Sequence, residues 1–182
     1  MDDLKNDFTF DDILVTNFVN VSSEEKEMIR TFRNHDTIKK WMYNDKDITR
    51  EEHFNFIKML KHDNHNNYWI VKKGVQYIGV ISLKGINRRH KNAYIGIYTN
   101  PYTEIKGKGS LLIQCIKKIA FDISNLHTLK LEVMCDNQRA ISFYQRAGFT
   151  EEGRLKEFVF KNNKWYDMII MGIINGEVIS AN

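Results

Sequence analysis

Hydrophobic and polar residues follow two different periods along this chain, which mark predicted strands and helices. Period-two apolar runs predict strands at residues 8–15, 68–73, 77–83, 93–99 and 128–134, and a hairpin turning at Asn162-Asn163. Helical spacing and capping residues, among them Ser22 and Thr49, predict helices at 22–34, 36–43, 48–62, 109–124 and 137–148. The middle three strands follow one another closely, so we expect them to form an antiparallel meander.

The length and composition describe an ordinary globular chain. It has 182 residues, enough for about one domain, and we expect a single domain over 1–182. Hydrophobic residues make up 42%, with only 10 Gly and 1 Pro, which excludes disordered and collagen-like classes. The net charge of +4 suits an anionic small molecule and supports nucleic-acid binding only weakly. The basic run at 87–91 is expected to be a solvated hairpin tip, and no nucleic-acid partner is predicted.

Localisation and metal binding are predicted from what the sequence lacks. The first ten residues are acidic and differ from a secretory signal, and no apolar run approaches the roughly 20 residues that span a bilayer. Two cysteines, Cys115 and Cys135, suit a reducing compartment, so we expect a cytoplasmic protein with no membrane partner. His62 and His65 have no third ligand nearby in sequence, and no metal is predicted.

A glycine-containing loop between a strand and a helix is the first candidate for chemistry. In TNPYTEIKGKGSLL, Gly107 and Gly109 allow an anion to approach backbone N–H groups at the positive end of a helix dipole. Lys106 and Lys108 add positive potential. An isolated Gly-Lys-Gly is more often a flexible turn, and a P-loop is excluded because Gly109 follows Lys108 where a hydroxyl residue is needed.

A second motif downstream supports the anion-binding interpretation. The segment NQRAISFYQRAGF at 137–149 resembles the second signature of the GNAT family of N-acetyltransferases, and the glycine loop resembles the first. Its matching residues are Asn137, Ala140, Phe143, Tyr144, Gly148 and Phe149. The first signature departs from the family at Glu104, where Gln or Arg is usual. We expect the Glu104 side chain to point away, because a carboxylate beside a diphosphate is unfavourable.

The resemblance covers nearly the whole chain and implies a fold, a cosubstrate and contacts. It implies an α/β (α+β) GNAT fold, a mixed, mostly antiparallel sheet of about seven strands flanked by helices. It also implies acetyl-CoA as acetyl donor, with direct transfer to an amine. The residues implied to contact acetyl-CoA are Tyr98, Thr99, Ile105, Lys106, Gly107, Lys108, Gly109, Ser110, Asn137 and Tyr144.

Three residues are candidates for the chemistry of transfer. Tyr144 matches the family tyrosine near the coenzyme sulfur, which implies a proton or hydrogen-bond donor for the departing thiolate. Glu132 stands mid-strand opposite the apolar face of Leu131 and Val133, and we predict that it accepts the amine proton, directly or through water. A salt-bridged strand residue is an equal alternative. Ser82 is a weaker candidate for holding the acceptor or a relay water.

Aromatic and cationic residues near the start of the chain are candidates for binding the acceptor. These are Arg33, Trp41, Met42, Tyr43, His53 and Phe56. Arg33 offers a fork for phosphate, while His53 and Phe56 share a helix face and could sandwich a nucleobase. Simple packing of the helices is the alternative, and it is the stronger one for Trp41 and Phe56 taken singly.

Short segments resemble one GNAT subgroup in particular, the flagellin-modifying N-acetyltransferases of pseudaminic acid biosynthesis. They are RNH, WMY, EEHFNFI, GIYTNP, KGKG, LEVM and GRLKEF. This resemblance implies the 4-amino group of a UDP-linked 4-amino-4,6-dideoxy-N-acetyl-altrosamine as acceptor. It also implies that Tyr94 or Tyr98 lines the sugar pocket.

Two further functions stay open at this point. A ribosomal-protein-type N-terminal acetyltransferase shares the Arg-Asn segment and the ending Trp165 to Asp167. The other is a non-catalytic acetyl-CoA-binding module, against which the presence of Glu132 and Tyr144 argues. The sequence leaves the oligomeric state open, with a homodimer among the alternatives.

Overall fold

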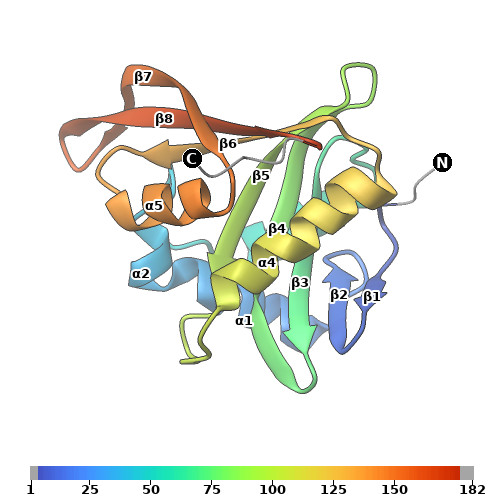
Figure 1. The fold of residues 1–182 in the computed structure, drawn as a ribbon. Helices are drawn as coiled ribbons and strands as arrows, with labels where there is room; N and C mark the ends of the chain where they lie inside the picture. The colour runs from blue at the N-terminus through green and yellow to red at the C-terminus, as the bar shows by residue number, and fades with distance from the viewer. Residues whose placement is uncertain (1–3, 177–182) are drawn as a thin grey trace.

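The fold is a twisted sheet of eight strands between two layers of helices. It was analysed as a computed structural model, which describes residues 4–176 (Figure 1). The strands are β1 (Phe8–Phe10), β2 (Ile13–Asn17), β3 (Asn67–Lys73), β4 (Gln76–Asn87), β5 (Asn92–Thr99), β6 (Thr128–Met134), β7 (Thr150–Lys161) and β8 (Lys164–Ile174). The helices are α1 (Ser23–Asn34), α2 (Asp36–Lys39), α3 (Arg50–Leu60), α4 (Lys108–Lys117), the π-helical segment η1 (Lys118–Ile123) and α5 (Gln138–Arg146).

The sheet order is β1-β2-β3-β4-β5-β6-β8-β7, and β5–β6 is its one parallel pair among residues 4–176. The antiparallel meander β3–β4–β5 and the mixed, mostly antiparallel sheet are therefore confirmed. The count is eight rather than about seven, because the single strand predicted at 8–15 is a hairpin. Asp11 adopts a left-handed conformation (φ 52°) that turns β1 back onto β2.

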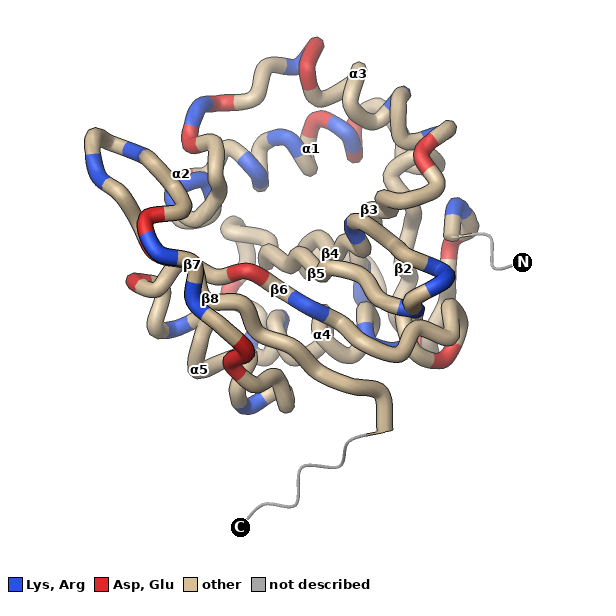
Figure 2. The backbone as a smooth tube through the Cα atoms, turned by 90° about the horizontal axis from the view of Figure 1, so that it is seen from above, with Lys and Arg blue, Asp and Glu red and all other residues tan. Residues whose placement is uncertain are grey.

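Helices α1 and α3 cover one face of the sheet, seen at the top of Figure 2. Both begin with a reciprocal capping box, Ser22 with Glu25 and Thr49 with Glu52, as the sequence indicated for Ser22 and Thr49. Beneath them a cluster of buried side chains packs on β3 and β4. Its members are Phe18, Val21, Ile29, Phe32, Ile38, Ile57, Leu60, Ile70 and Val80.

Helix α2 is shorter than the predicted 36–43. Beyond Lys39 the amides of Trp41 and Met42 bond to carbonyls three residues back, which tightens the chain into turns. The carbonyl groups of Lys39, Lys40 and Met42 also accept hydrogen bonds from Lys161, a residue 119 or more positions away. The sequence pattern around residues 36–43 contains no sign of that distant partner.

The main core lies on the other face, under α4, η1 and α5 (Figure 1). Helix α4 starts at Lys108 and widens at Lys118 into η1, whose end is marked by the bond from the Ser124 amide to the Ile119 carbonyl. The predicted helix over 109–124 is therefore correct in extent. Helix α5 is capped by Asn137 and ends before Gly148 (φ 92°), as predicted.

The hairpin near the end of the chain is confirmed with its turn. Asn162 and Asn163 both have positive φ, 51° and 56°, the combination that a tight two-residue hairpin requires. Because β8 pairs with β6, the hairpin extends the sheet beyond the parallel pair, and β7 forms its edge. A bulge between Leu155 and Val159 bends β7.

Candidate active site

The sheet opens between its two parallel strands. Within the described residues, β5 and β6 pair only at Asn92–Thr128, Ala93–Leu129 and Tyr94–Lys130. Both strands continue for several residues beyond Tyr94 and Lys130. Because each strand keeps its other neighbour, backbone groups of both that face the gap are left available for a ligand.

The start of α4 provides the anion-binding geometry that the sequence indicated. Gly107 is in the left-handed conformation (φ 79°), which places the first N–H groups of the helix at its exposed end. A Cβ on Gly109 would lie 3.0 Å from the ring of Phe143, so the absence of a side chain lets α4 approach α5 closely. Lys106 and Ser110 are exposed beside this turn, and Ile105 packs against the core.

Two charged residues, Glu104 and Lys108, flank this turn. Glu104 is exposed. The ammonium of Lys108 bonds to the carbonyls of Asn100 (2.6 Å) and Thr103, and burial lowers its pKa. Lys108 thus fastens the loop before α4 and does not supply the free positive charge that we expected of it.

Four predicted site residues lie on one face of the sheet. Ser82 pairs with Gly96, between Tyr94 and Tyr98 on β5, and Tyr94 pairs with Lys130, two residues before Glu132. Alternation therefore places Ser82, Tyr94, Tyr98 and Glu132 on the same face, the one that α1 and α3 cover. Ser82 is buried, 4% exposed, and its hydroxyl lies 3.4 Å from the Gly96 carbonyl. Thr99 ends β5 opposite Gly79.

A hydrogen bond joins two of the predicted functional residues across 89 positions of sequence. The phenol of Tyr43 donates to Oε2 of Glu132, and the Tyr43 ring meets the edge of Phe158 at 6.4 Å. Burial, together with the adjacent carboxylate, raises the pKa of Tyr43. The acceptor-side prediction (Tyr43) and the base prediction (Glu132) therefore meet in a single contact.

Tyr144 lies on the opposite side of the sheet, in α5 (Figure 2). Its ring packs edge-on against Phe143 at 5.1 Å and Phe149 at 5.8 Å. Burial raises the pKa of Tyr144 to about 12. Asn137 caps α5 by accepting from the Ala140 amide, so part of its hydrogen-bonding capacity is already used within the helix.

Some of the predicted acceptor residues have an unpaired or exposed group, whereas others are packed against the core. Arg33 donates from Nη2 to the Asn44 carbonyl (2.7 Å), while its Nη1 is buried without a hydrogen-bond partner among residues 4–176. Trp41 is 36% exposed, with Lys40 above its ring. Met42 and Phe56, in contrast, pack against the cluster under α1 and α3.

The predicted nucleobase slot between His53 and Phe56 is closed. The two rings lie 6.5 Å apart on α3, as the spacing indicated, but His53 is only 5% exposed and contacts Phe18. Desolvation by burial, with the charge of Arg30, lowers the pKa of His53 to about 4. His53 is thus buried against Phe18, and a role for it in acceptor binding stays a prediction.

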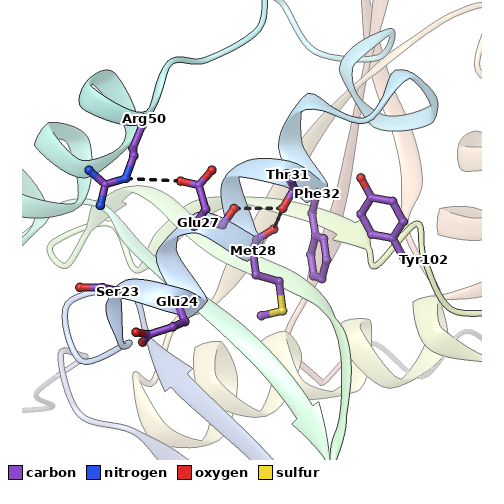
Figure 3. Close-up of a pocket in the computed structure, with 8 residues that line it drawn as sticks. All are labelled: Ser23, Glu24, Glu27, Met28, Thr31, Phe32, Arg50 and Tyr102. Atoms are coloured by element: carbon purple, nitrogen blue, oxygen red, sulfur yellow. Dashed lines mark hydrogen bonds and ion pairs between the residues drawn. The ribbon is translucent and has the colours of Figure 1, made fainter.

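Two hollows mark the surface near these residues. One, of about 570 Å³, lies along α1 and includes Glu27, Phe32, Arg50 and Tyr102, with Glu27 facing Arg50 (Figure 3). It contains none of the predicted catalytic residues. The other, of about 490 Å³, lies between α2 and the β7–β8 hairpin and includes Trp41 and Met134. Met134 follows Glu132 on the same face of β6, so the second hollow adjoins the Tyr43–Glu132 contact.

Comparison with known proteins shows the family. The model of the acetyltransferase (GNAT) family matches residues 27–149. The chain belongs to the GNAT family of acetyltransferases. It is 37% identical to acetyltransferase PseH of Campylobacter jejuni, over 81% of this chain and 91% of that protein.

Two solved GNAT structures resemble the whole fold. Spermidine N-acetyltransferase of Vibrio cholerae, solved with CoA and spermine, matches with a TM-score of 0.82 at 26% identity, over 91% of this chain and 96% of that one. The structure of Campylobacter jejuni PseH matches with a TM-score of 0.69 at 28% identity, over 90% and 99% of the two chains. The fold and the acetyltransferase activity that the motifs implied are therefore confirmed.

One structurally central residue escaped the sequence analysis. Lys161 is 7% exposed and holds the segment before Tyr43 through three carbonyl groups. Lys161 lies two residues after Val159 on β7, so alternation along the strand places it on the inward face. The pattern of the predicted hairpin could have indicated this position.

In the described part of the chain there is no cluster of three or more His, Cys, Asp or Glu residues that could hold a metal, and no helix long and apolar enough to span a membrane.

Proposed function

We propose that this GNAT enzyme transfers the acetyl group of acetyl-CoA to the 4-amino group of a UDP-linked amino-dideoxy sugar in pseudaminic acid biosynthesis. The observation that carries the proposal is the 37% identity to acetyltransferase PseH over 91% of that protein's length. It agrees with the resemblance of the short motifs, from RNH to GRLKEF, to the flagellin-modifying subgroup.

The gap between β5 and β6 fits acetyl-CoA. The exposed N–H groups at the start of α4, from Gly107 to Ser110, would hold the diphosphate, with Lys106 beside them. The free backbone edge of β5 towards Tyr98 and Thr99 would hold the pantetheine arm. When bound, acetyl-CoA supplies an activated acetyl thioester. The CoA complex of the Vibrio cholerae relative supports binding of this cosubstrate.

The proton acceptor and the hydrogen-bond donor of the reaction lie on opposite sides of the gap. Glu132, on the face covered by α1 and α3, accepts the proton of the attacking amine as the new C–N bond forms. Tyr144, on the other side, donates a hydrogen bond to the sulfur as the C–S bond breaks. Ser82, buried on the Glu132 face, holds the acceptor or a relay water.

The acceptor occupies the face that carries Tyr43 and Glu132. The unpartnered Nη1 of Arg33 is suited to a phosphate oxygen of the UDP group, because a buried guanidinium N–H without a partner is costly. Tyr94 lines the sugar pocket, and exposed Trp41 offers an aromatic surface to the uracil ring.

A UDP thermal shift tests the acceptor class. We expect saturating UDP to raise the melting temperature of the pure protein, and the shift to vanish in Arg33→Ala but persist in Arg50→Ala, an exposed arginine outside the site. Each variant is compared with its own melting temperature without UDP. No shift in the unmodified protein would contradict a nucleotide-linked acceptor.

Release of CoA from acetyl-CoA tests the reaction itself. We expect the UDP-linked 4-amino sugar to give the largest kcat/KM in a panel that also contains ribosomal N-terminal peptides and spermidine. A larger value for the peptides would favour the N-terminal acetyltransferase alternative. A larger value for spermidine would place the chain with the polyamine enzymes that its structural relative represents.

A further inference from the structure

Lys161 is a buried lysine whose ammonium group is bound entirely by a distant backbone segment and a nearby acid. It donates to the carbonyls of Lys40 (2.7 Å) and Met42 (3.1 Å), and lies 3.4 Å from that of Lys39. The carboxylate of Asp45 is 3.9 Å away. Its side chain is 5% exposed, so these bonds are formed in a site largely closed to water.

The segment that Lys161 binds has little stability of its own. Helix α2 has four residues, and a single helical turn is not stable in isolation because its nucleation is costly. The Lys40 and Met42 carbonyls just beyond its end accept from Lys161, and a cation there complements the helix dipole. The course of the chain from Lys39 to Met42 thus depends on the ammonium of Lys161.

Tyr43 follows Met42 directly, and its contacts are few. Its side chain is 49% exposed, its ring meets the edge of Phe158, and its hydroxyl donates to Glu132. A half-exposed tyrosine keeps such a bond only if the backbone before it is fixed. Lys161 fixes that backbone from the same face of the sheet, since Lys161 alternates with Val159 on β7.

We propose that Lys161 is a positioning residue for the catalytic base: it holds the 39–42 segment so that the Tyr43 hydroxyl stays bonded to Glu132. The proposal rests on the proposed function, in which Glu132 accepts the amine proton. The bond holds the Glu132 carboxylate in one orientation.

The other groups around Glu132 offer no equal substitute for Tyr43. Lys130, two residues earlier on β6, is paired with Glu152 of β7. Tyr94 of β5 faces the Tyr43 side, and the β8 partner of Glu132 is the apolar Ile170. The charges acting on Lys161 are Asp45 and Arg33. Loss of the Tyr43 bond therefore leaves the carboxylate without a comparable group to orient it.

The test compares kcat and KM for Lys161→Met, Lys161→Arg and a control, using the amine that gives the fastest CoA release. The control is Lys164→Met, because Lys164 lies across the same turn, 64% exposed and 3.6 Å from Asp136. In Lys161→Met we expect kcat to fall about tenfold while KM for acetyl-CoA changes by less than about twofold. Lys161→Arg should restore most of this, and Lys164→Met should match the parent.

A double variant separates positioning from stability. Tyr43→Phe alone should lower kcat as Lys161→Met does, and adding Lys161→Met to it should lower kcat no further. An unchanged kcat in Lys161→Met, or an additional loss in the double variant, would overturn the proposal. If Lys161→Met does not fold, Lys161→Gln, which keeps an N–H donor, replaces it, with a smaller loss of kcat in the same direction expected.

Failure of the proposal and failure of the base assignment give different results. If Glu132→Gln keeps the parent kcat, Glu132 is not the base and the proposed chemistry is wrong. If Glu132→Gln loses activity while Lys161→Met keeps the parent kcat, the base assignment stands and only the role of Lys161 is refuted.

Discussion

The Tyr144 hydroxyl should act as a hydrogen-bond donor rather than transfer its proton completely. Burial raises the pKa of Tyr144 to about 12, whereas the pKa of a free thiol is about 8.5. The difference of about 3.5 pKa units corresponds to about 5 kcal/mol against full transfer to a thiolate. A hydrogen bond to a charged acceptor contributes about 1.5–3 kcal/mol. Tyr144→Phe should therefore lower kcat by roughly 10- to 150-fold.

The assay is continuous detection of released CoA with a thiol reagent, at saturating acetyl-CoA, across pH 6–10. The Phe side chain keeps the packing against Phe143 and Phe149, so KM for acetyl-CoA should change much less than kcat. The exposed Tyr102→Phe serves as the control. A fall of less than about threefold, or a basic limb between about pH 8 and 10 that Tyr144→Phe removes, would refute this reasoning.

Three other predictions concern stability and cosubstrate binding. Gly109→Ala places a Cβ 3.0 Å from the Phe143 ring, so it should lower the melting temperature and weaken CoA binding measured by calorimetry. Asn137→Ala removes the cap of α5 and should lower the free energy of unfolding in urea by about 1 kcal/mol. Because the pKa of His53 is about 4 when folded and near 6.5 when unfolded, unfolding free energy should fall by up to about 3 kcal/mol between pH 6.5 and 4. His53→Leu should abolish that dependence; an unchanged slope would contradict it.

The elements that were predicted from sequence are those determined by local patterns. The strand at 128–134, the cap at Thr49 and the Asn162-Asn163 turn were all placed correctly, because alternation, a cap hydroxyl and left-handed turn residues act within a few positions. The predicted strand at 8–15 failed at Asp11, where a left-handed residue breaks an otherwise suitable β pattern.

Candidate site residues were predictable where they belong to family motifs. They were less predictable where packing between distant segments determines the position of a side chain. Tyr144, Gly107 and Gly109 could be found because the motif gives their spacing. Burial of His53 depends on the packing of α3 over Phe18, which no local pattern reveals. The Tyr43–Glu132 bond joins two segments 89 residues apart, and only the folded chain shows it.

Because β5 and β6 share only three residue pairs within residues 4–176, the sheet consists of two plates joined at one corner. Strands β1 to β5 form the first plate and β6 to β8 the second. Beyond that corner, apolar side chains such as Ile95, Leu131 and Ile116 and the bonds of Tyr43 and Lys161 keep them together. Apolar attraction has no preferred direction, unlike a ladder of backbone bonds. A ligand bound between β5 and β6 would therefore add directional contacts where the sheet has few of its own.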